Sequence, residues 1–133
     1  RFEPRVREAF SILTAPRNKR GGMRQRQPRQ HDAEHLAYLR QLPCVICGDN
    51  TSTEACHVRM PDLRADKPKV GLQEKPDDCW ALPMCGAHHR AQHEMTERKF
   101  WDFGVVDPIF ICLALSRVSG DVEAGERIVR EWQ

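Results

Sequence analysis

The sequence lacks a long hydrophobic run, an apolar leader and, over its first thirty residues, a balance of acidic side chains. Its longest apolar stretch, residues 109–115, is far shorter than the roughly eighteen apolar residues of a membrane-spanning helix. Residues 1–30 contain no apolar core like that of a secretory signal peptide. These absences argue against a membrane or secreted protein and predict a cytoplasmic one.

The shortage of acids leaves residues 1–30 strongly basic, with nine Lys or Arg against two Glu and a formal charge of +7. The other 103 residues hold 12 bases and 17 acids. Such an arm suits a polyanion such as DNA, because each phosphate contact releases counterions. The alternative is a solvated tail without a specific partner. We therefore divide the chain into an arm, residues 1–30, and a domain, residues 31–133. The candidate DNA contacts of the arm are Arg17, Lys19, Arg20, Arg24, Arg26 and Arg29.

The cysteines follow the spacing of a metal site more closely than that of disulfides. Cys44 and Cys47 form a Cys-x-x-Cys pair, and Cys85 and His88 form a Cys-x-x-His pair. Three sulfurs and one imidazole fill the tetrahedron of a structural zinc ion and leave no position for a substrate. This pattern favours zinc in a reducing compartment. Cys79 competes for a place in the set but lacks a partner at the same spacing.

Two further histidines, His89 and His93, follow the Cys-x-x-His pair at a spacing of four. Residues so spaced lie on one face of a helix, where they can hold a second metal ion. The sequence therefore predicts two separate sets of metal ligands.

The predicted class is α+β. A helix is expected where apolar residues recur at helical spacing, and a strand where a short segment stands between turn residues. Asp107-Pro108 reads as a helix start, with a capping side chain before a proline. The expected helices cover residues 2–13, 31–41, 86–98, 107–119 and 121–132, and the expected strands cover residues 54–59 and 79–84, separated by a long loop.

The order strand, long loop, strand, helix is that of a ββα-metal element, and three segments allow a family comparison. They are Leu-Arg-Gln-Leu-Pro-Cys-x-x-Cys-Gly at 39–48, Glu-Ala-Cys-His-Val-Arg at 54–59, and Asp-x-Trp-Ala-Leu-Pro-Met-Cys-x-x-His-His-Arg-x-x-His at 78–93. Together they resemble the HNH endonucleases, especially a phage and prophage group that includes the recombination-enhancement nuclease. The resemblance covers roughly half of the chain.

The resemblance implies a small HNH domain that hydrolyses DNA phosphodiester bonds and leaves 5′-phosphate ends. By position, His57 at the end of the first strand is the general base, and His89 and His93 hold the catalytic divalent ion. That ion is Mg²⁺, Mn²⁺, Ni²⁺ or Zn²⁺, beside the structural Zn²⁺. Arg59 and Arg90 flank the inferred site and are candidate DNA contacts. Family analogy also allows a recombinase filament as a partner.

The sequence departs from the family pattern at two positions. The residue before the base is Cys56 where the family usually has Asp or His, and it is either an unusual metal ligand or an inert buried thiol. The middle Asn of the family is absent, since asparagine occurs only at positions 18 and 50. Asp78 stands at the matching end of the loop, where its carboxylate either orients His57 or is merely solvated.

Two other functions compete with the nuclease. One is a zinc-dependent nucleic-acid-binding module whose catalytic metal site has decayed. Cys56 and the missing Asn favour it. The other is a zinc-stabilised protein-interaction adaptor, which leaves the basic arm unexplained.

Overall fold

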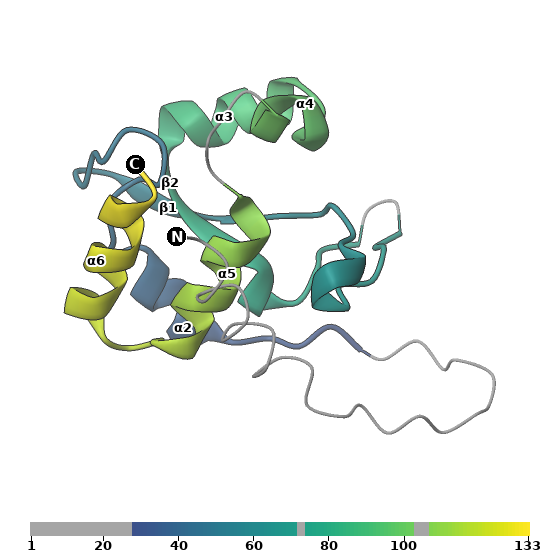
Figure 1. Cartoon of the computed structure of the whole chain (residues 1–133), viewed down its shortest axis with the longest axis horizontal. Coiled ribbons are helices and arrows are strands. Elements are labelled where there is room, and N and C mark those ends of the chain that lie inside the picture. The colour runs from purple at the N-terminus through teal and green to yellow at the C-terminus, as the bar shows by residue number, and fades with distance from the viewer. Residues whose placement is uncertain (1–27, 72–73, 103–106) are drawn as a thin grey trace.

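A computed structural model of the chain describes residues 28–71, 74–102 and 107–133. Those residues form an α+β fold in which helices pack around one small antiparallel sheet (Figure 1). No helix within these ranges is long and apolar enough to cross a membrane. The elements in chain order are α2 (Ala33–Leu39), β1 (Thr53–His57), η1 (Leu63–Ala65), η2 (Asp78–Trp80), β2 (Ala81–Cys85), α3 (Gly86–Glu94), α4 (Glu97–Asp102), α5 (Pro108–Arg117) and α6 (Val122–Glu131).

The register of the sheet decides which candidate residues lie at which end. Thr53 pairs with Cys85, and His57 pairs with Ala81. The end of β2 that carries Cys85 leads directly into α3. The opposite end follows η2, so His57 lies next to the 3-10 turn that begins at Asp78. The predicted zinc ligand Cys85 thus lies at one end of the sheet, and His57 lies at the other.

Helix α5 supplies much of the core. Asp107 caps it by accepting a hydrogen bond from the Ile109 N–H at 3.1 Å, and Pro108 occupies its first turn, as the sequence predicts. Most of its side chains are buried, including Cys112, and it contacts both β2 and α6. In Figure 1 the strands lie between α3 and the group formed by α2, α5 and α6.

Helix α6 approaches α2 closely because residue 125 has no side chain. A Cβ placed on Gly125 would lie 2.2 Å from the Tyr38 hydroxyl and 2.9 Å from Leu42 Cδ2. The Tyr38 hydroxyl also donates to the Asp121 carbonyl at 2.9 Å, immediately before α6 begins. Glycine is therefore required here by contact between two helices.

Three expectations about the elements need correction. The helix expected over residues 86–98 is two helices, because the Thr96 hydroxyl accepts from the Lys99 N–H at 3.3 Å and starts α4 anew. Cys79, expected in a strand, lies in η2. The loop over residues 60–77 contains η1 and a bridge between Asp62 and Lys67. The helix expected over residues 2–13 lies outside the described residues.

Candidate functional site

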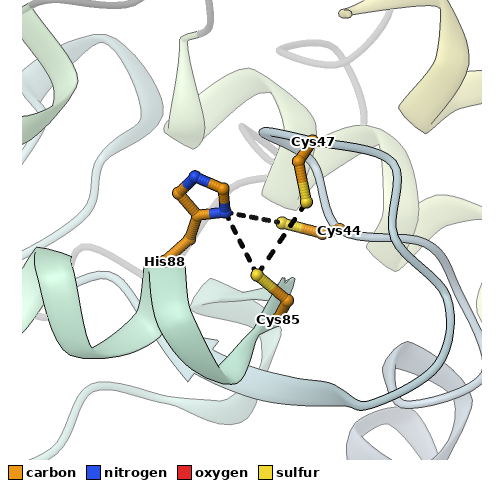
Figure 2. Close-up of side chains that lie close together, drawn as sticks. All are labelled: Cys44, Cys47, Cys85 and His88. Atoms are coloured by element: carbon orange, nitrogen blue, oxygen red, sulfur yellow. Dashed lines mark hydrogen bonds between the residues drawn. The ribbon is translucent and has the colours of Figure 1, made fainter.

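Cys44, Cys47, Cys85 and His88 converge on one point, as Figure 2 shows. Their ligand atoms all lie within 4.8 Å of one another. His88 Nδ1 is 3.1 Å from Cys85 Sγ and 3.7 Å from Cys44 Sγ, and the sulfurs of Cys47 and Cys85 are 3.9 Å apart. Ligand atoms bound to one zinc ion at the tetrahedral angle stand roughly 3.4–3.8 Å apart. The four side chains therefore fit a zinc ion, and they could hold one.

Local structure explains how the knuckle at Cys44 forms. The Gly48 N–H donates to the Cys44 carbonyl at 2.9 Å, and Gly48 has a φ of 78°, which favours glycine. Burial raises the pKa of the Cys44 thiol, but backbone N–H groups of Cys85, Cys47 and Ile46 directed at the sulfur lower that pKa below its usual value. The thiolate is the form that binds zinc. The backbone of the knuckle thus prepares Cys44 for a metal.

Asp78 is a buried carboxylate on which several donors converge. His57 Nε2–H donates to Asp78 Oδ1 at 2.8 Å, and the Asp32 N–H donates to Oδ2 at 2.8 Å. The Arg29 guanidinium also donates to Oδ1. Burial alone would raise the pKa of Asp78, but these hydrogen bonds and the charge of Arg29 hold it at about 2. Asp78 is thus ionised at neutral pH, and it is a held partner of His57 rather than a solvated loop residue.

The partner of His57 fixes which ring nitrogen can accept a proton. Because an ionised carboxylate only accepts hydrogen bonds, the bond to Asp78 places the proton of neutral His57 on Nε2. The lone pair is then on Nδ1. Burial lowers the pKa of His57 below its usual value and outweighs the neighbouring Asp78, which raises it. His57 is therefore neutral at pH 7, the state that a general base needs.

The end of the basic arm joins this group. Arg29 Nε–H donates to the Pro76 carbonyl at 3.0 Å, and its Nη2 lies 3.4 Å from His57 Nε2. The neighbouring Gln30 N–H donates to Asp77 at 2.9 Å, and its carbonyl accepts from the Asp78 N–H at 3.0 Å. The sequence placed Arg29 among general DNA contacts. Its position beside His57 could not be read from the charge pattern.

His89 and His93 are brought together on α3, as their spacing predicts. Their Nε2 atoms are 3.0 Å apart, and the ring centroids are 4.8 Å apart. His89 Nδ1 lies 3.1 Å from Glu54 Oε2 on β1. Glu54 was missed in the sequence. The signal for it is the alternation of β1, which turns Glu54 and Cys56 to the same face.

Cys56 lies on that face of β1 but in the interior. Its Sγ donates to Gln92 Oε1 on α3 at 2.7 Å, and the side chain is fully buried. Burial, together with the charges of Glu97 and Glu54, raises the pKa of the Cys56 thiol to about 12. Cys56 is therefore a neutral, hydrogen-bonded thiol at pH 7 in this structure. Within the described ranges, one group of three or more His, Cys, Asp or Glu side chains is close enough to share an ion. That group is Cys44, Cys47, Cys85 and His88.

The residues around His57 and the residues around His89 lie on different faces of β1. His57 donates a hydrogen bond to Asp78 and lies 3.4 Å from Arg29 Nη2, whereas His89 contacts Glu54 and His93. Alternation along a strand turns position 57 away from the face of positions 54 and 56, which α3 covers.

The remaining predicted DNA contacts are placed unevenly. Arg59 donates through Nη2 to the Gly71 carbonyl at 2.8 Å, so its guanidinium holds the long loop. Arg90 is exposed on α3, with Nη1 3.2 Å from where a Cβ on Gly86 would stand. The other arm residues of the set, Arg17, Lys19, Arg20, Arg24 and Arg26, lie outside the described residues.

Comparisons with protein-family models, with curated proteins and with solved structures find no match to this chain.

Proposed function

We propose that this protein is a metal-dependent endonuclease of the HNH type that hydrolyses DNA phosphodiester bonds. The observation that carries the proposal is the His57–Asp78 pair, in which a buried ionised carboxylate orients a neutral imidazole. A neutral imidazole held by a carboxylate is a general base, and burial that keeps it neutral suits it to pH 7. The paired histidines of α3 could hold the divalent ion that this chemistry requires.

In this mechanism His57 Nδ1 accepts a proton from a water molecule as the water oxygen forms a bond to phosphorus. The bond from phosphorus to the 3′ oxygen breaks, which leaves a 5′-phosphate and a 3′ oxygen that takes up a proton from water. Asp78 stabilises the resulting imidazolium, and Arg29, 3.4 Å from His57 Nε2, binds the phosphate with the donors that Pro76 and Asp78 leave over. A divalent ion, which His89 and His93 would hold, would supply charge neutralisation at the departing oxygen.

The partner in this proposal is DNA, and the basic arm of residues 1–30 adds affinity without sequence preference, because phosphate contacts carry no sequence information. The setting is a bacterial or phage-infected cell, in which the enzyme processes DNA during recombination. A recombinase filament remains a candidate partner by the same resemblance.

The test is conversion of supercoiled plasmid to nicked or linear DNA with Mg²⁺, Mn²⁺, Ni²⁺ or Zn²⁺ added in turn. We expect His57→Ala to lose about 10²–10⁴-fold in rate, the usual contribution of a general base. His31→Ala, which removes an exposed histidine, is the matched control and should cleave like the parent. Equal cleavage by His57→Ala, or no cleavage with any of the four metals, would overturn the proposal.

A second candidate, a zinc-dependent nucleic-acid-binding module, is favoured by two observations. Cys56 is a buried neutral thiol bound to Gln92, and the histidines of α3 and His57 lie on different faces of β1. Such a module would retain DNA with an affinity that falls steeply with salt, yet leave plasmid intact under every metal.

A further inference from the structure

Glu54, His89 and His93 form a chain of polar contacts on the α3 side of the sheet. The Glu54 carboxylate lies 3.1 Å from His89 Nδ1, and His89 Nε2 lies 3.0 Å from His93 Nε2. Each nitrogen of the His89 ring therefore faces a different partner. Glu54 is half exposed and comes from β1, so the contact joins the strand to the middle of α3.

The carboxylate decides the tautomer of His89. An ionised carboxylate only accepts hydrogen bonds, so the neutral ring carries its proton on Nδ1 and its lone pair on Nε2. That lone pair then points toward His93 rather than toward Glu54. A histidine that binds a metal through one nitrogen commonly donates its other N–H to a carboxylate in this way.

The spacing of the two Nε2 atoms fits a shared ion. At a metal–nitrogen distance of roughly 2.1 Å, two ligand nitrogens lie about 3.0 Å apart at a right angle and about 3.4 Å apart at the tetrahedral angle. The observed separation is 3.0 Å. Two neutral imidazoles are borderline ligands that prefer Ni²⁺, Co²⁺, Cu²⁺ or Zn²⁺ to Mg²⁺.

The Glu54 carboxylate lies close to Gly86 at the start of α3. A Cβ on Gly86 would stand 3.6 Å from Glu54 Oε2 and 3.2 Å from Arg90 Nη1. The carboxylate therefore lies beside the first turn of the helix, where the backbone N–H groups favour a negative charge. His89 holds Glu54 in place.

We propose that Glu54 is a positioning residue for a divalent transition-metal ion bound by His89 and His93. Glu54 contacts the ligand His89 and not the ion, and it locks His89 in the tautomer whose Nε2 faces the ion. Glu54, and not Cys56, is then the β1 residue that supports this metal. This inference rests on the metal-binding part of the proposed function, which it deepens by naming the class of ion and the residue that prepares its ligand.

The experiment is titration of Ni²⁺ into the full chain already loaded with zinc, followed by calorimetry, with zinc content measured before and after. We expect one Ni²⁺ site that His93→Ala abolishes. Glu54→Ala should weaken it about 10–100-fold, the usual effect of removing a carboxylate behind a ligand histidine. Glu54→Gln should lose less, because its amide oxygen still accepts from Nδ1–H. Glu94→Gln, an exposed change on the same helix, is the matched control.

A purely structural role for Glu54 would not change the His89 tautomer, which nitrogen-15 NMR measures directly without metal. We expect the Nδ1–H form in the parent and a shift toward the Nε2–H form in Glu54→Ala. Unchanged Ni²⁺ affinity or an unchanged tautomer in Glu54→Ala would overturn the proposal, as would a Ni²⁺ site that survives His93→Ala. Plasmid cleavage is scored separately, so loss of the nuclease proposal and loss of this one are distinguishable.

Discussion

At Asp78 three side-chain and backbone donors meet a single buried carboxylate, and its protonation should be visible in stability. Its pKa of about 2 in the folded protein lies below the value near 3.9 of an unfolded chain. A carboxyl with a depressed pKa contributes stability above its unfolded pKa and loses that contribution as pH falls through the folded pKa.

Asp78→Asn should therefore be less stable than the parent above about pH 4, and the difference should shrink toward pH 2. Denaturant unfolding of both proteins at each pH measures it. Because acid removes zinc from both proteins alike, the difference between them isolates Asp78. A gap that stays constant from pH 6 to pH 2 would count against the ionised, hydrogen-bonded carboxylate.

The Cys56 thiol gives a second test at the residue scale. Cys56→Ala leaves Gln92 Oε1 without its donor in the interior, which should cost about 1–3 kcal/mol of unfolding free energy. Cys56→Ser keeps a donor at that position and should cost less. Neither change should alter Ni²⁺ affinity, because the Cys56 Sγ–H donates to Gln92 and His89 contacts Glu54. A large loss of Ni²⁺ binding in both variants would make Cys56 a ligand after all.

Among single residues, those in local patterns were predictable and those in long-range contacts were not. The spacing of Cys44, Cys47, Cys85 and His88 predicts their convergence, because the number and type of ligands fix the site. The contact between Glu54 and His89 joins residues 35 positions apart, and strand alternation indicates the face of Glu54 but not this partner. Arg29 and Asp78 are 49 positions apart, and the same holds for them.

At the scale of elements, caps were more informative than hydrophobic periodicity. Asp107-Pro108 predicted the start of α5 because the capping side chain and the proline act locally. The break between α3 and α4 was missed, although Thr96 carries a capping hydroxyl, because the expected helix continued past it. The 3-10 turn at Asp78–Trp80 was missed because Cys79 and Trp80 are as apolar as the strand that follows.

The close contact between α6 and α2 at Gly125 should be visible in the stability of the protein. Gly125→Ala should destabilise the protein by about 1–3 kcal/mol, since overpacking costs more than the gain in helix propensity. The new Cβ would stand 2.2 Å from the Tyr38 hydroxyl. Thermal unfolding measures the effect. Arg127→Ala, an exposed change on the same helix, should shift the melting temperature little. An equal or higher stability of Gly125→Ala would show that the helices separate without cost.

For the whole molecule, we expect the largest single effect on stability from the cluster of Cys44, Cys47, Cys85 and His88. Cys47 is exposed, so replacing it by serine should cost little unless it binds an ion. We expect one zinc ion per chain and a loss of several kcal/mol in Cys47→Ser, since structural zinc can supply about 10–16 kcal/mol. Cys79→Ser, outside the cluster, is the control. Metal analysis and thermal unfolding decide it, and an unchanged zinc content in Cys47→Ser would remove this site.

The same cluster has a consequence for how this chain tolerates changes in length. Cys47 and Cys85 are 38 positions apart, so an ion held between them closes a ring that contains β1, the long loop and β2. The entropy lost on closing such a ring grows only with the logarithm of its size, at about 0.6 kcal/mol for each doubling. Insertions near residues 68–75 should therefore be inexpensive, and the distance along the chain from His57 to Asp78 can drift while the two side chains stay together.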